Sequence, residues 1–264
     1  MTNYKSLKYT LVAGLLLAVS VRADPVSVRQ VQGFAHGFVV LKDLNDKILA
    51  SGDSIQISRA NRITTTLTLH FKDGSLYREI SVFSQRRTYR LLSYKQVQKG
   101  PAFKTQETLS FDTSTGNVNV RYTDKDGKAK AITTQISLPP DLANGIITTI
   151  LGDVDPKAET TLSMLVATPK PRIVKLKISA SGQDSFSIGA SPAKATRYIV
   201  NVDIGGITGA VAKVIGKQPP PTYVWVSAGK APTFLRSEGS LYNEGPIWRV
   251  ELASPTWRKD SQRQ

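Results

Sequence analysis

The stretch Ile63-Thr64-Thr65-Thr66-Leu67-Thr68-Leu69-His70-Phe71-Lys72-Asp73-Gly74 decides the fold class of this 264-residue chain. Its odd positions to 71 carry isoleucine, threonine, leucine, leucine and phenylalanine, whereas its even positions to 70 carry three threonines and a histidine. A period of two places these sets on opposite faces of a β-strand, one dry and one wet or half wet. Asp73-Gly74 then supplies a hairpin turn. The sequence therefore predicts hairpin-linked antiparallel strands.

Similar turns separate apolar-alternating runs on both sides of this stretch. They are Asn45-Asp46, Ser114-Thr115-Gly116-Asn117 and Asp126-Gly127. We expect an N-terminal meander over about residues 35–137, with strands at about 37–44, 47–57, 62–71, 75–84, 86–98, 104–111, 117–123 and 128–137. A second group of strands is expected over about 159–252, at about 159–167, 172–179, 184–189, 195–204, 222–227, 232–237 and 246–252.

The segment between the two groups predicts a helix over about 139–151. Its apolar side chains fall on one half of a helical wheel, and its polar residues fall on the other. Pro140 and Asp141 suit a first turn, and Gly152 suits the end. Gly145 disfavours a helix by about 1 kcal/mol, so burial must hold the segment. A second candidate, residues 207–215, is compatible with either helix or strand.

These patterns predict a mainly β fold. We expect a strongly curved antiparallel sheet, either a half-barrel or an open barrel, with one or two short amphipathic helices as a cover. Residues 24–264 are expected to form a single domain. The sequence leaves open whether the segment at 139–151 is a mobile lid or fixed core.

The N-terminus predicts a secretory signal peptide at residues 1–23. Lys5 and Lys8 precede an apolar run, and Val21-Arg22-Ala23 suits cleavage near Ala23. The chain is therefore expected to be exported, periplasmic or secreted, and soluble after cleavage. It contains no cysteine, which excludes disulfides, thiolate metal sites and a cysteine-linked lipid anchor.

The charge balance favours anionic partners. With 35 Lys and Arg against 20 Asp and Glu, the formal net charge is +15, which suits lipid headgroups, surface polysaccharide or nucleic acid. The densest basic spots are Arg86-Arg87 and Arg258-Lys259, and no run of five or six like charges occurs. Charge spread over solvated strand faces is therefore the alternative. Arg86 to Arg90 interleaves basic and aromatic residues as nucleic-acid surfaces do, but an exported protein seldom meets nucleic acid, so no such partner is expected.

The motifs that could carry chemistry are incomplete. Gly52-Asp53-Ser54-Ile55 resembles a serine-nucleophile block, but neither His36 nor His70 lies in the context that would make it the base. We interpret Asp53-Ser54 as a strand bend. Ser191 to Lys194 and Ser227 to Lys230 match Ser-x-x-Lys without the accompanying elements. Two histidines without cysteine argue against zinc, so no catalytic residue, metal, cofactor or enzymatic activity is predicted.

The aromatic residues Trp225 and Trp248 lie in apolar C-terminal strands, where they would be core or would line a cavity. The residues predicted to bind a ligand, as cavity or lid, are Leu142, Ile146, Ile147, Ile150, Leu151, Trp225 and Trp248.

The overall layout resembles exported bacterial proteins of the Lol-type lipoprotein-carrier architecture and related uncharacterised β-rich families. The features that carry the resemblance are the signal peptide, the long meander, Leu138-Pro139-Pro140-Asp141, and the final strands ending in Gly245-Pro246-Ile247-Trp248-Arg249. The resemblance implies a curved antiparallel sheet whose concave face holds acyl chains or another apolar ligand beneath helical lids.

The expected function is a periplasmic or secreted, non-enzymatic binding protein for a lipid or other apolar small molecule. The alternative is a structural or adhesive envelope protein that binds anionic polymer or headgroups through its basic surface. Transient contact with an anionic membrane is compatible with both. The sequence does not set the oligomeric state.

Overall fold

The computed structural model describes residues 25–124, 126–167, 170–204 and 219–257. The predicted signal peptide at 1–23 and the candidate segment at 207–215 lie outside this part of the chain. In the described ranges, no helix has the length and apolar character needed to cross a membrane.

Strands make up most of the described chain. Their bounds are β1 (Ala35–Lys42), β2 (Ile48–Arg59), β3 (Arg62–Phe71), β4 (Leu76–Gln85), β5 (Tyr89–Lys99), β6 (Glu107–Asp112), β7 (Asn117–Thr123), β8 (Ala129–Gln135), β9 (Thr160–Val166), β10 (Arg172–Ile188), β11 (Ser191–Asp203), β12 (Thr222–Ser227), β13 (Phe234–Ser240), β14 (Ile247–Leu252) and β15 (Pro255–Trp257). A single helical turn, α1 (Ile147–Ile150), lies between β8 and β9.

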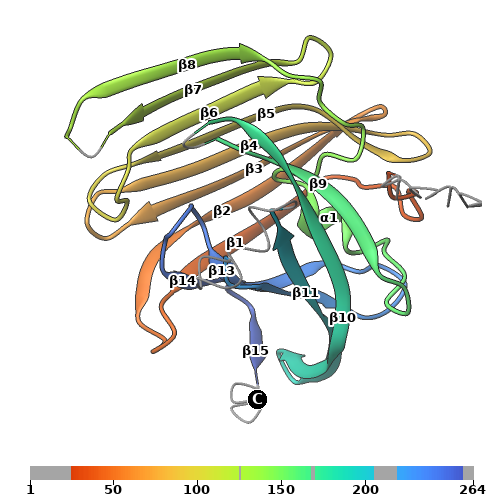
Figure 1. The fold of residues 1–264 in the computed structure, drawn as a ribbon. Coiled ribbons are helices and arrows are strands. Elements are labelled where there is room, and N and C mark those ends of the chain that lie inside the picture. Colours follow the sequence, from red (N-terminus) through yellow and green to blue (C-terminus); the bar gives the residue numbers. More distant parts are fainter. Residues whose placement is uncertain (1–24, 125, 168–169, 205–218, 258–264) are drawn as a thin grey trace, which may run out of the picture.

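All fifteen described strands belong to one open antiparallel sheet (Figure 1). Its order is β15-β10-β11-β12-β13-β14-β1-β2-β3-β4-β5-β6-β7-β8, and β9 pairs with β10 outside this path. Figure 1 shows the sheet bending so that β9 and β10 lie across one face of the N-terminal meander. The prediction of a mainly β, open antiparallel sheet is confirmed.

The strands of the N-terminal meander begin and end close to the positions predicted from the sequence. Further along the chain, the strands predicted at 172–179 and 184–189 are one continuous strand, β10, with an irregularity in its pairing between Ala180 and Gly182. Strand β15 was not predicted. The bend predicted at Asp53-Ser54 is wrong, because both residues lie inside β2 with regular pairing on both sides.

The helix predicted over about 139–151 is wrong in its extent, since only Ile147–Ile150 is helical. Gly145 adopts the left-handed conformation, with φ at +66°, which interrupts an α-helix. Upstream of it, the chain extends along β9 instead. Ala143 N–H donates to the carbonyl of Ser163, and Ser163 N–H donates to the carbonyl of Asp141. Pairing with the edge of β9 therefore prevails over a weak helical propensity.

The polar residues of this segment anchor it to β9 and β10. The Asn144 side chain bonds both the N–H and the carbonyl of Leu165 at 2.9 Å. The Asp141 carboxylate accepts from the Ser163 hydroxyl at 2.8 and 2.9 Å and from Lys175 at 3.4 Å. Both Asp141 and Asn144 are buried, so these polar groups are not the solvent-facing half of a helix.

The apolar residues of the segment fill the space inside the bend of the sheet. Leu142, Ile146, Ile150 and Leu151 are each no more than 2% exposed. They share one core cluster with the inner faces of β3–β7 and of β9–β12. In this structure the segment therefore forms part of the core between the two halves of the sheet.

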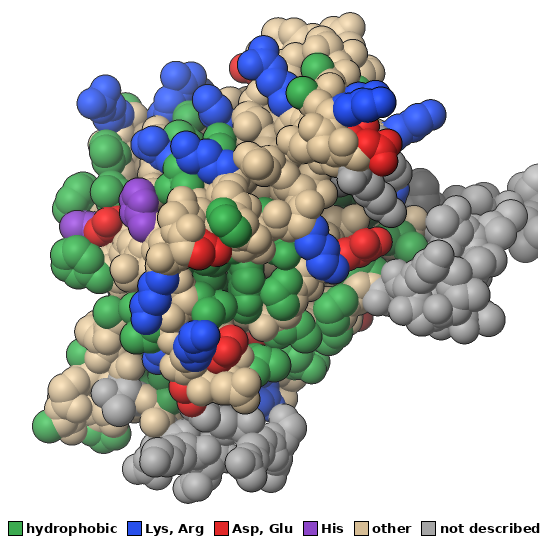
Figure 2. Space-filling model, turned by 90° about the vertical axis from the view of Figure 1, so that its left-hand side faces the viewer, with side chains coloured by type: hydrophobic (Ala, Val, Ile, Leu, Met, Phe, Trp, Pro, Cys, Tyr) green, Lys and Arg blue, Asp and Glu red, His purple; other side chains and the backbone are tan. Residues whose placement is uncertain are grey.

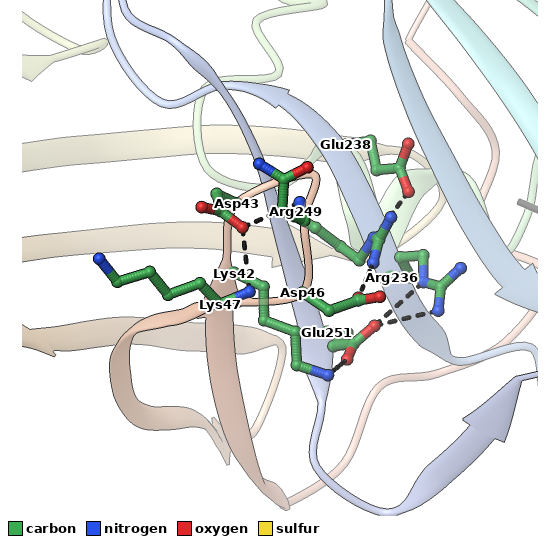
Figure 3. A network of polar contacts seen from close by, with 9 residues as sticks. Lys42, Asp43, Asp46, Lys47, Arg236, Glu238, Arg249 and Glu251 are labelled. Carbon is green, nitrogen blue, oxygen red and sulfur yellow. Dashed lines mark hydrogen bonds and ion pairs between the residues drawn. The ribbon is translucent and has the colours of Figure 1, made fainter.

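An ion-pair network braces the junction of these halves (Figure 3). Arg236 on β13 donates from Nε and Nη2 to Glu251 on β14, both at 3.1 Å, and Lys42 on β1 contacts the same carboxylate. Arg249 on β14 donates to Glu238 at 2.8 Å and to Asp46 at 2.6 Å. The network links the first strand of the chain to its last long strands.

Tyr94 and Glu79 lie beneath the Gly145 backbone on the inner face of the sheet. The Tyr94 hydroxyl donates to the Glu79 carboxylate. Burial raises the pKa of Glu79, while the bond from Tyr94 opposes that rise. Burial and the nearby Glu79 charge raise the pKa of Tyr94. A carboxyl group is therefore held next to the backbone at Gly145.

The first prediction concerns Gly145→Ala. A β-carbon there would lie 2.0 Å from the Ser81 hydroxyl oxygen, so the substitution adds a clash to an unfavourable φ. We expect a loss of about 2–4 kcal/mol in the free energy of unfolding, measured by urea denaturation. The control is Gly127→Ala, where φ is +76° and no atom lies within 4 Å, with an expected loss of about 1 kcal/mol. Equal losses in the two variants would contradict this packing.

The second prediction concerns pH. Because the pKa of Glu79 is raised on folding, the folded protein binds more protons than the unfolded chain between about pH 4.5 and the raised value. This contribution to stability is present at lower pH and is lost as the pH rises through that window. In Glu79→Gln the loss disappears, so the free energy of unfolding of the variant relative to the parent should increase from pH 4 to pH 7.

Tyr94→Phe is the matched variant for this second prediction. It removes the hydrogen bond that lowers the pKa of Glu79. The free energy of unfolding should therefore fall more between pH 4 and pH 7 in this variant than in the parent. Urea titrations at several pH values measure both effects. If the difference in free energy of unfolding between the Glu79→Gln variant and the parent stays constant with pH, the raised pKa of Glu79 is refuted.

Candidate functional site

Strands β2–β7 present two faces of opposite character. The inner face carries the core side chains, such as Ile63, Phe83 and Val118. The outer face carries the alternating side chains, and none of them is buried between β2 and β7. The threonines of β3 at positions 64, 66 and 68 lie on this outer face, as the alternation in the sequence predicted.

The outer face of β2–β7 is strongly basic. Seven exposed cations project from it, and none forms an ion pair with another described residue: Arg59, Arg62, Arg78, Arg90, Lys95, Lys99 and Arg121. Two carboxylates share this face, and both have partners. Asp53 pairs with His36 at 2.8 Å, and Asp112 accepts from the backbone and hydroxyl of Ser114.

The strand register brings several of these cations close together. Arg59 lies directly opposite Arg62, and Ser84 is paired with Arg62 on one side and with Arg90 on the other. Like charges that face each other across strands destabilise a sheet. An anion bound at this face would relieve that repulsion.

A phenylalanine patch adjoins the basic face, defined by Phe34, Phe38 and Ile57. Their exposed fractions are 75%, 67% and 43%. Phe38 is paired with Asp53, and the pairing of Ala35 with Gln56 places Phe34 next to Ile57. Figure 2 shows green hydrophobic side chains around the purple histidines at the left of the view, with blue Lys and Arg side chains above them. Large apolar side chains therefore project from the same side as the cations.

The residues of the serine-nucleophile motif lie on opposite faces of the sheet. His36 Nε2 lies 2.8 Å from Asp53 Oδ1 and its ring lies 5.0 Å from that of Phe38. This pair is on the outer face. Ser54 follows Asp53 within β2, so alternation directs its side chain to the inner face. The histidine and carboxylate are therefore not aligned with the serine.

An open groove of about 540 Å³ lies over β4–β7. Its lining residues include Ile80, Lys95, Ser110 and Asn119, which the register places in one row across the four strands. The neighbouring row contributes Ser93 and Asp112. Alternation places these side chains on the basic outer face.

The structure brings together five of the seven residues predicted to bind a ligand. Leu142, Ile146, Ile150 and Leu151 lie in the main core, and Ile147 packs against it while partly exposed.

The two predicted tryptophans lie elsewhere. Trp225 belongs to a separate cluster with Phe186 and Leu235, and it donates from Nε1 to Asp184 at 2.6 Å. Trp248 belongs to a third cluster with Phe71 and Phe103. The structure does not join either residue to the segment at 142–151 in one cavity.

The sequence predicted a basic surface without locating it on β2–β7, and it did not predict the groove. Part of the basic face can be read from the alternation in the sequence, because each cation alternates along its strand with residues that face the core. Arg121, for example, lies between Val120 and the partly buried Tyr122. The assembly of the cations into a face depends on which strands pair and in what register. The exposure of Phe34 and Phe38 likewise depends on the absence of a covering element.

The comparison with known families gives one match. The family model described as "Protein of unknown function (DUF3108)" matches residues 38–241, which extend from β1 past the end of β13 and include the whole outer face of β2–β7. No curated protein and no solved structure matches the chain. Because the match covers well over half of the 264 residues, the chain belongs to the DUF3108 family of proteins of unknown function.

Proposed function

We propose that this protein is an exported, non-enzymatic binding protein that docks on an anionic bilayer surface through the outer face of β2–β7. The observation that carries the proposal is the combination of seven exposed cations without ion-pair partners in the described chain and a phenylalanine patch on the same side. The predicted signal peptide supports export to a compartment bounded by membranes.

The geometry of a sheet suits a planar, charged partner. Strands lie about 4.8 Å apart, so β2–β7 spread their cations over about 24 Å. Each Lys or Arg close to an anionic lipid surface contributes roughly 1 kcal/mol. Engagement of four or five of the seven would contribute roughly 4–5 kcal/mol, which decays within a Debye length of about 8 Å at physiological salt.

The phenylalanine patch favours a bilayer over a soluble anionic polymer. Aromatic and aliphatic side chains next to Lys and Arg are typical of protein surfaces that enter the headgroup region. Phe34 and Phe38 project into solvent without contributing to the core clusters. Binding of a soluble anionic polymer would require only the cations and would leave the exposed phenylalanines without a role.

Binding of a lipid or other apolar molecule inside the bend of the sheet stays a prediction. Within the described residues, Leu142, Ile146 and Leu151 pack against the sheet itself, so a ligand would have to displace them. The cations of the outer face have no such competitor, and this difference makes docking the better-supported function.

Vesicle binding tests the proposal. Wild-type protein should co-sediment with vesicles containing phosphatidylglycerol and should dissociate as salt rises from 50 to 500 mM. The variant Arg62→Glu, Arg78→Glu and Arg121→Glu should bind at least 100-fold more weakly. A control variant with the same charge change on exposed sites away from this face is Lys128→Glu, Lys157→Glu and Arg172→Glu, which should lose less than tenfold.

Three outcomes decide between the proposals. Equal losses in the two triple variants would show that net charge, and not this face, governs binding. Binding to a soluble polyanion without binding to vesicles would assign the polymer-binding alternative. Lipid recovered in organic extracts of protein that does not bind vesicles would support the interior apolar ligand instead.

A further inference from the structure

We infer that the groove over β4–β7 binds a phosphorylated polyol, as the headgroup-binding part of the docking face. This inference rests on the proposed function, because it assigns a specific ligand chemistry to one place on the face that docks. The groove has a volume of about 540 Å³, which lies in the range of small-molecule pockets, about 300–1,000 Å³. It is therefore large enough for a phosphate together with a hydroxylated group.

The floor of the groove is a row of side chains fixed by the sheet. Lys95 is paired with Ser110, and Ser110 is paired with Asn119. Adjacent strands lie about 4.8 Å apart, so an ammonium, a hydroxyl and an amide line up over about 10 Å. Such a row can bond several oxygens of one ligand at once, as phosphate recognition requires.

The donors in this row are available. Lys95 has no ion-pair partner among the residues that the structure describes, and within the same residues the hydroxyls of Ser93 and Ser110 form no hydrogen bond. The Asn119 carbonyl oxygen accepts from the Thr133 hydroxyl at 3.1 Å. This bond orients the amide and leaves its N–H₂ group to donate to a ligand.

Asp112 gives the groove a hydrogen-bond acceptor beside its donors. Its Oδ1 accepts from the backbone N–H groups of Ser114 and Thr115 at 2.8 and 3.2 Å and from the Ser114 hydroxyl at 2.5 Å. These bonds lower the pKa of Asp112 and stabilise its charge locally. Its second oxygen remains for a ligand hydroxyl, which favours a phosphate that carries hydroxyl groups over inorganic phosphate.

The test uses the full chain and a soluble probe, myo-inositol 1-phosphate. Titration followed by backbone amide chemical shifts should move the signals of Ser93, Lys95, Ser110 and Asn119. Lys95→Gln should weaken binding of the probe at least tenfold. The matched control is Lys99→Gln, which removes one exposed cation from the same strand and face, next to Leu76 and outside the groove lining, and should weaken it less than twofold.

Two results would overturn the inference. Equal weakening by Lys95→Gln and Lys99→Gln would show general attraction to a basic face, and so would inorganic phosphate binding as tightly as the probe. Asn119→Asp keeps the size of the side chain and adds a negative charge, so it should abolish probe binding in a protein that still folds.

The same reagents separate this inference from the proposed function. Vesicle binding that survives while the probe causes no shifts would leave docking standing and remove the headgroup site. Shifts confined to the groove residues, in a protein that does not bind vesicles, would keep the site and remove the docking proposal.

Discussion

The pairing of β1 with β14 is the contact on which the rest of the structure depends, because it makes one sheet from two halves of the chain. Val39 faces Leu252 and Leu41 faces Val250, and the ion pairs from Lys42 and Arg236 to Glu251 brace the same junction (Figure 3). A continuous sheet has only two faces. Once the bend encloses the segment at 142–154 on the inner face, the outer face of β2–β7 is left to water.

Several features of that outer face are not needed for folding. The alignment of Arg59 with Arg62 opposes like charges across strands, which costs stability. Phe34 and Phe38 are mostly exposed, although each would stabilise the fold more if buried. The segment at 139–151 shows the opposite arrangement, in which the buried Asp141 carboxylate is matched by Ser163 and Lys175. Polar and apolar groups that the fold leaves without partners indicate a surface that meets another molecule.

The sequence predicted the strands well because period-two alternation and turn residues act locally, as in β3, whose bounds agree with the prediction. It failed at 139–151 because the outcome there depends on distant residues. Asp141 and Asn144 bond to Ser163 and Leu165, and a wheel drawn from the segment alone cannot represent those partners. The groove was not predicted for a related reason, since Lys95, Ser110 and Asn119 fall in one row only through the register of β5, β6 and β7.

The most direct test of the account uses the absence of cysteine from the chain, which allows single nitroxide labels at introduced cysteines. Thr66 lies on the outer face of β3, and Ala158 lies in an exposed turn away from it. On addition of vesicles containing phosphatidylglycerol, the label at position 66 should become shielded from a water-soluble nickel chelate, while the label at position 158 should remain accessible. Shielding at position 158 with continued accessibility at position 66, in protein bound to the vesicles, would contradict docking through the outer face.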